Sequence, residues 1–370
     1  MLSCFGGSRR RRRNNFAHQE ARHAGDSSSA ITKSFTYSEL KEATNNFSQV
    51  SKIGRGGFGI VYKGTLRNGL QVAVKALAAE SKQGVREFWT EIETISNVKH
   101  PNLVELIGCC VHGDNRLLVY EYLENKSLDR ALFGQSRTVH LDWRTRAAIC
   151  MGTAQGLSYL HEALVPHIVH RDIKASNILL DKAFMPKIGD FGLAKLFPDN
   201  MTHISTKIAG TTGYLAPEYV LGGQLTLKAD VYSFGVLMLE VVSGKNNSGT
   251  NWGGQQKILL EQAWQLHEGG NLLELVDPEL DQFPKEEVLK YMKVALFCTQ
   301  ANASRRPMMS QVINMLSRNI KLNEEELTPP GLFQDPVVGL NVPPKQNVSD
   351  TSTSQPMSSA PFTITQVSAR

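Results

Sequence analysis

Residues 170–177 read His-Arg-Asp-Ile-Lys-Ala-Ser-Asn, and no other stretch of this 370-residue chain constrains its structure as tightly. Further along the chain come Asp190-Phe191-Gly192 and then Ala216-Pro217-Glu218. An isolated aspartate on a loop is nearly always solvated, so Asp172 alone would carry no functional weight. Its meaning comes from the lysine and asparagine that follow it and from the motifs on either side.

Upstream, residues 54–61 read Gly-Arg-Gly-Gly-Phe-Gly-Ile-Val and match the pattern G-x-G-x-x-G-x-V. Dinucleotide-binding turns also use G-x-G-x-x-G, but they need a helix directly after the glycines. Here residues 60–63 are Ile-Val-Tyr-Lys, whose β-branched and aromatic side chains favour a strand. A glycine-rich hairpin lets the backbone approach phosphates without Cβ clashes. The next predicted strand, residues 72–75, ends in Lys75, the expected partner of nucleotide phosphates.

Taken in this order, the motifs resemble those of the eukaryotic protein kinase family over roughly residues 47–317. The resemblance implies an α+β, bilobal protein kinase fold. Its small lobe would hold an antiparallel β-sheet with one main helix, and its larger lobe would be mainly helical. Residues 35–47 (FTYSELKEATNNF) and 210–219 (GTTGYLAPEY) are more narrowly similar to plant receptor-like kinases of the receptor-like kinase/Pelle family. Without an ectodomain or a membrane span, the chain is similar to the receptor-like cytoplasmic kinases, among them the cold-responsive type.

The resemblance implies that Lys75 contacts the α- and β-phosphates of ATP and is held in place by a helix carboxylate. Glu91 is the expected partner, sixteen positions after Lys75 in the sequence. Glu87 and Glu93 are competitors, and Glu87 lies one helical turn away on nearly the same face. Because Glu91 falls between Phe88 and Ile95 on the apolar face of the predicted helix, it is preferred over a solvated role.

Four further assignments follow from the resemblance. Asp172 is expected to accept the proton of the substrate hydroxyl, and Lys174 to reach the γ-phosphate and offset its charge. Asp190 and Asn177 are expected to hold Mg²⁺, an ion that prefers hard oxygen ligands. Lys174 is also the residue that Ser/Thr-type members carry at this position, and Thr211 matches the threonine that supports the catalytic aspartate.

The ATP site implied by the resemblance has an adenine slot, a residue guarding its back and a hinge at residues 121–123. Its expected residues are Ile53, Gly54, Arg55, Gly56, Gly57, Phe58, Gly59, Ile60, Val61, Ala73, Lys75, Tyr120, Tyr122 and Leu179. The resemblance also implies a hydrophobic stack above Asp230 and a buried ion pair between Glu218 and Arg306. The members of the stack are Ile95, Leu106, His170 and Phe191.

The chain divides into four expected parts. Residues 1–34 form a disordered, basic segment, residues 35–46 a helix beside the kinase domain, residues 47–318 the domain itself, and residues 319–370 a disordered tail rich in Pro, Ser and Thr. Periodicity predicts a helix over residues 87–98 and strands at 103–110 and 116–121. The polar insert at residues 243–256 is expected to be a surface loop. Further helices are expected at 146–160, 230–242, 259–266, 285–298 and 309–316.

Composition narrows the class of protein further. The formal charge is +5, and residues 1–30 contribute +4 of it through six arginines against two acidic residues. The nearly neutral remainder argues against a nucleic-acid-binding protein. The five cysteines have no paired C-x-x-C spacing, which argues against a disulfide framework or a zinc site. No apolar stretch approaches the length of a membrane span, and an intracellular protein is expected.

The leading hypothesis is an active Ser/Thr protein kinase that uses ATP and Mg²⁺. It would phosphorylate Ser and Thr on proteins, including itself, downstream of plant cell-surface receptors or stress perception. We expect an upstream receptor kinase as a partner, and no nucleic acid. The alternative is a membrane-associated pseudokinase scaffold, against which the intact catalytic residues argue. Arg171 leaves a cation without an anionic partner, so phosphorylation of Ser205 or Thr206 is predicted to switch the enzyme.

The N-terminal residues predict the location of the protein. Position 2 is leucine, so the Met-Gly start required for N-myristoylation is missing. Cys4 lies beside five consecutive arginines, residues 9–13, and an acyl chain on Cys4 would supply the second signal that stable anchoring requires. We expect peripheral attachment to the cytoplasmic face of the plasma membrane, with the cytosol or the nucleus as alternatives.

Overall fold

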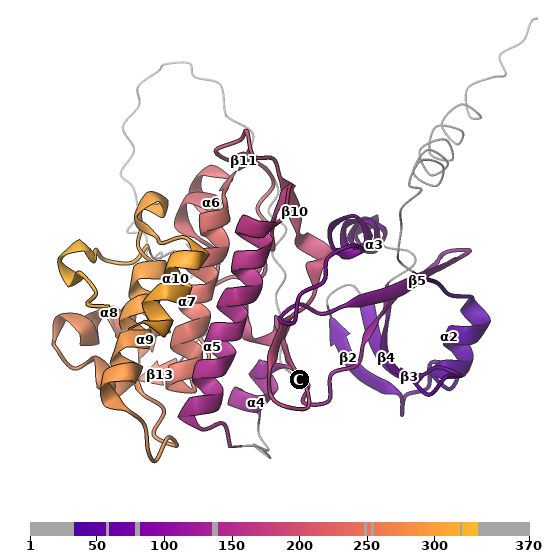
Figure 1. Ribbon diagram of the computed structural model, residues 1–370, viewed down its shortest axis with the longest axis horizontal. Coiled ribbons are helices and arrows are strands. Elements are labelled where there is room, and N and C mark those ends of the chain that lie inside the picture. The colour runs from indigo at the N-terminus through magenta and orange to yellow at the C-terminus, as the bar shows by residue number, and fades with distance from the viewer. Residues whose placement is uncertain are drawn as a thin grey trace, which may run out of the picture.

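The computed structural model of the chain consists of two lobes that meet at the segments carrying the sequence motifs (Figure 1). The smaller lobe holds the β-sheet and the larger one is mainly helical, which confirms the expected bilobal α+β fold. The structure describes residues 33–56, 59–77, 82–134, 140–247, 250–252, 255–318 and 320–331.

The small lobe is built on a six-stranded sheet with the order β1-β5-β6-β4-β3-β2. All neighbouring pairs are antiparallel except β1 and β5, which run parallel. Gly69 adopts a left-handed φ of +83° at the turn between β3 and β4, as an Asn-Gly hairpin turn requires. The strands are β1 (Lys33–Ser34), β2 (Lys52–Gly56), β3 (Gly59–Thr65), β4 (Gln71–Leu77), β5 (Leu106–His112) and β6 (Asn115–Glu121).

The sheet corrects two expectations from the sequence. Residues 33 and 34, assigned to the disordered segment, form β1 and pair with Gly108 and Cys109. The strand predicted to start at Leu103 starts at Leu106 instead. The physical reason is that the Val104 amide bonds to the Ile188 carbonyl in the large lobe. The chain around Val104 therefore connects the two lobes, and it enters the sheet only at Leu106.

One helix covers each face of the sheet. On the outer face lies α2 (Tyr37–Ala43), which Thr36 and Glu39 begin with a capping box. Phe35 and Leu40 anchor this segment in a small apolar core between α2 and the sheet. On the other face lies α3 (Lys82–Ile95). It begins five residues before the start of the helix predicted at residues 87–98 and ends three residues before the predicted end.

The large lobe is assembled around α7 (Leu227–Ser243), of which almost every residue is buried. A continuous apolar core runs from Leu77 of β4 to Leu316 of α10, so it links both lobes. The surrounding helices are α4 (Leu128–Phe133), α5 (Trp143–Ser158), α6 (Pro217–Gly222), α8 (Leu259–Glu268), α9 (Lys285–Cys298) and α10 (Met309–Ser317). A single π-helical turn, Tyr159–Ala163, continues α5.

The large lobe also contains short strands and 3-10 turns, some of which hold the motif residues 170–177 and 190–192. The strands are β7 (His167–Val169), β8 (Ile178–Leu180), β9 (Pro186–Ile188), β10 (Lys195–Phe197), β11 (Ile204–Ser205) and β12 (Gln224–Leu225). The 3-10 turns are Ala175–Asn177, Phe191–Leu193, Leu272–Leu275, Ala303–Arg305 and Glu324–Glu326.

Within the described ranges, no helix has both the length and the apolar character needed to cross a membrane.

Two further expectations about the large lobe are wrong. The insert at residues 243–256 is not a plain loop, because it contains the hairpin of β13 (Thr250–Trp252) and β14 (Gln255–Lys257). It also contributes the buried Asn247, whose amide Nδ2 donates to the Gly213 carbonyl at 2.8 Å. The folded domain does not end at residue 318, since Leu322 and Leu327 pack against the core and Gly331 bonds to Thr299.

Candidate active site

The side chain of Lys75 joins the two lobes. In the register of the sheet Lys75 lies directly opposite Val61, so both side chains lie on the face of the sheet that α3 covers. Lys75 Nζ is 2.6 Å from Glu91 Oε1 and 2.8 Å from Asp190 Oδ1. Desolvation opposes the charge of the ammonium, but attraction to Asp190 and Glu91 outweighs it and raises the pKa of Lys75. The lysine therefore stays charged wherever the two carboxylates do.

The structure separates Glu91 from its competitors. Glu87 is buried on the same side of α3, but its carboxylate accepts from Gln83 at 3.1 Å. Glu93 is exposed. The second oxygen of Glu91, Oε2, accepts a hydrogen bond from the Tyr120 hydroxyl. The sequence placed Tyr120 at the back of the nucleotide site without indicating this bond, since nothing in the spacing of the two residues predicts it.

Asp172 is held by three side chains. Its Oδ1 accepts from Thr211 Oγ1 at 2.6 Å, and its Oδ2 lies 2.8 Å from Lys174 Nζ. Asn177 Nδ2 donates to both the backbone oxygen and Oδ2 of Asp172, at 2.8 and 3.0 Å. Lys174 also donates to Thr211 at 2.7 Å, so the four residues form one network. These contacts fix the orientation of the Asp172 carboxylate.

A buried carboxylate on α7 holds the backbone of the loop that carries Asp172. Asp230 accepts from the His170 and Arg171 amides at 2.7 and 2.8 Å and from His161 Nε2 at 2.9 Å. Burial disfavours its charge, but these donors, with His161 first, lower the pKa of Asp230. The contribution of His161 was not predicted, because only the fold brings the π-helical turn Tyr159–Ala163 to this point. Arg171 adopts a left-handed φ of 71°, a strained conformation held by these bonds.

The expected hydrophobic stack is assembled in the structure. Ile95, Leu106 and Phe191 belong to one core, and the rings of His170 and Phe191 meet edge to face with centroids 4.8 Å apart. Next to Phe191, Asp190 has a left-handed φ of 64° that turns its carboxylate toward Lys75. Gly192 fits closely under α3, since an added Cβ would lie 3.2 Å from the Glu87 side chain.

The oxygen atoms expected to bind Mg²⁺ are free to do so. Asn177 uses its Nδ2 for Asp172, which leaves Oδ1 without a hydrogen bond to the part of the chain that the structure describes. The Asp190 carboxylate is half exposed and engages Lys75 through Oδ1 alone. The described residues contain no cluster of three or more His, Cys, Asp or Glu side chains that could cage a metal. Two protein oxygens beside substrate phosphates are the usual provision for Mg²⁺, so the residues fit the ion.

The residues predicted to contact adenine lie on the sheet and on β8. Ala73 pairs directly with Tyr120 across the sheet, and Leu179 lies in β8. Of the glycine-rich segment, residues 53–56 and 59–61 are described, and Gly57 and Phe58 lie outside the described residues. A contact that the sequence did not predict is that of Lys63, whose Nζ lies 4.1 Å above the Tyr122 ring.

The activation segment, residues 190–218, is tied down at both ends. Arg171 donates to the Leu193 carbonyl near the start of the segment, to the Lys207 carbonyl in its second half, and to the Tyr219 hydroxyl just beyond its end. At its end, Arg306 makes a bidentate pair with Glu218 at 2.8 and 2.7 Å, as expected. Ser205 is exposed in β11, and the backbone amide of its neighbour Thr206 bonds to the Gly223 carbonyl.

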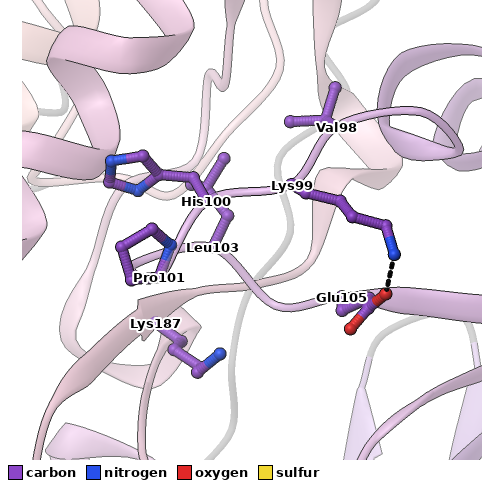
Figure 2. A pocket seen from close by; sticks show the side chains of 7 residues that line it. All are labelled: Val98, Lys99, His100, Pro101, Leu103, Glu105 and Lys187. Atoms are coloured by element: carbon purple, nitrogen blue, oxygen red, sulfur yellow. Dashed lines mark ion pairs between the residues drawn. The ribbon is translucent and has the colours of Figure 1, made fainter.

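A cavity of about 300 Å³ lies behind the junction of the lobes, apart from this network (Figure 2). None of Lys75, Asp172 and Asp190 lines it. Its rim carries the ion pair between Lys99 Nζ and Glu105 Oε1, 2.7 Å long. The lining residues are Val98, Lys99, His100, Pro101, Leu103, Glu105 and Lys187.

Comparison with known proteins agrees with this geometry. Residues 47–316 match the family model described as protein tyrosine and serine/threonine kinase. Cold-responsive protein kinase 1 of Arabidopsis thaliana is 53% identical over 307 residues, which cover 82% of this chain and 79% of that protein. Two probable LRR receptor-like serine/threonine-protein kinases of the same plant are 55% and 57% identical over 81% and 79% of this chain. The chain spans only 29% and 28% of the length of these two receptor-like relatives.

Proposed function

Because this chain belongs to the protein kinase family, we propose that it transfers the γ-phosphoryl group of ATP to Ser and Thr hydroxyls of proteins, itself included. The observation that carries the proposal is the network that fixes Asp172 between Thr211, Lys174 and Asn177. It lies next to the Lys75–Glu91–Asp190 network, because the amide of Gly189, the residue before Asp190, bonds to the Asn177 carbonyl. A pseudokinase scaffold would not require either network to be complete.

Each group has a defined task in this proposal. Asp172 accepts the proton of the substrate hydroxyl as the oxygen attacks, and its bonds to Thr211 and Lys174 hold the carboxylate in place. Lys174 places a positive charge beside the group being transferred, where negative charge spreads over the phosphoryl oxygens. Lys75, fixed by Glu91, orients the α- and β-phosphates. Asn177 and Asp190 would hold Mg²⁺, which when bound neutralises phosphate charge.

The preference for Ser and Thr over Tyr rests on Lys174 and Thr211. Lys174 Nζ lies within 2.8 Å of both Asp172 and Thr211, so its ammonium occupies the space beside the catalytic carboxylate. The similar receptor-like proteins bear names that specify serine/threonine-protein kinases. We infer the same preference for this chain.

Steady-state phosphorylation assays test the proposal. Purified full-length protein with ATP and Mg²⁺ should phosphorylate itself and a general protein substrate, and phosphoamino-acid analysis should find phosphoserine and phosphothreonine. Lys75→Met should lower the rate at least about 100-fold, the scale of one lost transition-state contact. Wild-type protein that binds ATP but transfers no phosphate would favour the scaffold instead.

The proposal extends to signalling from plant cell-surface receptors or stress perception, with a receptor kinase acting upstream. Support comes from the receptor-like relatives and from Arg171, which makes no ion pair within the described ranges. Its guanidinium bonds only to neutral acceptors, and its buried Nε has no hydrogen-bond partner in the described structure. A phosphate on Ser205 or Thr206 would supply the missing negative charge.

We also propose attachment to the cytoplasmic face of the plasma membrane through acylated Cys4 and the basic run at residues 9–13. All of these residues lie outside the described residues. Five arginines near an anionic membrane contribute roughly 5 kcal/mol, which is too little for durable anchoring without an acyl chain. Fractionation of wild type and Cys4→Ser, with and without hydroxylamine, tests the anchor. Identical partitioning of the two proteins would exclude an acyl chain at Cys4.

A further inference from the structure

The chain does not stop folding where the family model ends at residue 316. Residues 320–331, which we call the C-terminal strap, return across the large lobe. Leu322 and Leu327 pack against the main core, and Glu324 lies 2.5 Å from Lys293 on α9. These contacts bury apolar surface and fix the course of the strap along its first half.

The second half of the strap is held by backbone bonds to buried residues. Pro330 pairs with Gln300 in an isolated antiparallel bridge, and the Gly331 amide bonds to the Thr299 carbonyl at 3.3 Å. Thr328 donates to the side-chain oxygen of Gln300 at 3.1 Å. Thr299 and Gln300 are both buried, so the end of the strap is fixed against the interior of the domain and not against its surface.

Gly331 presses directly on the end of the activation segment. A Cβ at this position would lie 2.3 Å from Pro217 Cγ and 3.1 Å from Ala301 Cα. No side chain fits there unless Pro217, the first residue of α6, moves away. The position therefore requires glycine because of close packing, and not because of its backbone conformation.

A second contact leads from the strap to the same place. The Tyr232 hydroxyl on α7 donates to the Gly331 carbonyl, and the face of the Tyr232 ring lies 5.0 Å from the Arg306 guanidinium. Arg306 in turn holds Glu218 with two hydrogen bonds. Gly331 thus contacts Pro217 directly, and it is linked to Glu218 through Tyr232 and Arg306.

We propose that the C-terminal strap helps the enzyme to bind protein substrates. Gly331 of the strap and Tyr232 of α7 act as positioning residues, because they hold the end of the activation segment in place. By fixing Pro217 and Glu218, the strap sets the course of the preceding residues, which begin at Thr211, the residue that donates to Asp172 where the substrate hydroxyl would bind. The proposal rests on the kinase function proposed above. The strap's bonds to Lys293, Thr299 and Gln300 lie in the large lobe, so ATP binding is expected to be insensitive to it.

The test uses the full chain with Gly331→Ala and Tyr232→Phe, and with Gly269→Ala as matched control. A Cβ at Gly269 would make only ordinary contacts, the nearest at 3.5 Å. Both strap variants should raise the KM for a peptide substrate by about fivefold, the scale of one buried hydrogen bond, while the KM for ATP stays within about twofold. Amide hydrogen exchange should become faster over residues 204–222 in both, and the control should match wild type.

Two outcomes would overturn the proposal. One is an unchanged peptide KM with faster exchange confined to residues 320–331, which would make the strap a passive covering. The other is an equal rise of both KM values with faster exchange throughout the large lobe, which would indicate general destabilisation. Tyr232→Phe removes one hydroxyl and no packing volume, so it supplies the answer if Gly331→Ala fails to fold. Hydrogen exchange reports on residues 204–222 even in a protein without kinase activity, so it separates failure of this proposal from failure of the proposed function.

Discussion

The hydroxyl of Tyr120 donates a hydrogen bond to Oε2 of Glu91, whose other oxygen accepts from Lys75 at 2.6 Å. Tyr120 lies on β6 and Glu91 on α3, so the bond attaches the helix to the sheet from behind the nucleotide site. Both oxygens of a fully buried carboxylate are thereby satisfied. The position of α3, and with it that of Lys75, depends on this tyrosine as well as on the ion pair.

Replacing Tyr120 with phenylalanine should weaken catalysis without removing any catalytic group. Glu91 Oε2 would remain buried without a donor, at a cost of about 1–3 kcal/mol. We expect kcat/KM for ATP to fall about tenfold, since 1.4 kcal/mol corresponds to a factor of ten. Steady-state kinetics with varied ATP measures the effect.

Tyr159→Phe is the matched control for this change. The Tyr159 ring stacks on His100 with centroids 4.8 Å apart, and its hydroxyl has no hydrogen bond to any described residue. This variant should keep the wild-type kcat/KM. Equal values for all three proteins would show that the Tyr120 hydroxyl does not support Glu91.

The double substitution Ser205→Ala/Thr206→Ala should lower activity about tenfold or more if phosphate on this segment engages Arg171. The expected loss corresponds to one charge-assisted hydrogen bond, worth about 1.5–3 kcal/mol. Mass spectrometry of the active protein should find phosphate at one of the two positions. Thr202→Ala, an exposed residue of the same segment, should leave the rate unchanged. Full activity in the double variant would count decisively against the switch.

Glu240 should make stability depend on pH. It is fully buried on α7, where it accepts from the Tyr214 hydroxyl at 2.6 Å and the Asn247 amide at 2.9 Å. Burial raises the pKa of Glu240 to about 7, although these two bonds oppose the shift. The folded state therefore binds the proton more tightly than the unfolded chain, so stability falls as the pH rises from about 4.5 to 7.

Glu240→Gln removes this ionisation and keeps an acceptor for Tyr214. Relative to wild type, the variant should gain on the order of 2–3 kcal/mol in free energy of unfolding between pH 5 and pH 8. Denaturant unfolding of both proteins at the two pH values measures the difference. A wild-type-to-variant difference that does not change with pH would contradict the raised pKa.

Gly108→Ala should destabilise the small lobe. A Cβ at this position would lie 2.2 Å from the Lys33 carbonyl oxygen and 2.5 Å from the Phe35 ring. Because the obstacle is backbone as well as side chain, relief requires β1 to leave the sheet, and we expect a cost of about 1–3 kcal/mol. Thermal unfolding measures it, with Gly269→Ala as control. A melting temperature equal to that of wild type would mean that β1 contributes nothing to the stability of the sheet.

The fold and the residues of the candidate site could be predicted from the sequence because they depend on neighbouring residues or on known motifs. The helix predicted at residues 285–298 has the same bounds in the structure, Lys285–Cys298. Its apolar periodicity and its ends both depend on residues that are close in the sequence. The same holds for the hairpin at Gly69. The positions of Asp172, Lys174 and Asn177 within one short loop needed no knowledge of distant contacts.

What the sequence did not predict depends on contacts between distant segments. His161 reaches Asp230, 69 positions away, and Tyr120 reaches Glu91, 29 positions away. Such pairs leave no periodic or compositional signal. Composition also misplaced residues 320–331, because a polar, Pro-containing segment that buries two leucines is hard to distinguish from a disordered tail.

Asp172, held by its network, is proposed to accept the proton of the substrate hydroxyl during phosphoryl transfer. The most direct measurement is the single-turnover rate of transfer from ATP to a Ser-containing peptide by wild type and by Asp172→Asn, with ATP binding measured on both proteins. The account predicts equal ATP affinity and a rate at least about 100-fold lower in the variant, because the group that accepts the proton is lost. A wild-type rate no faster than that of Asp172→Asn would contradict it.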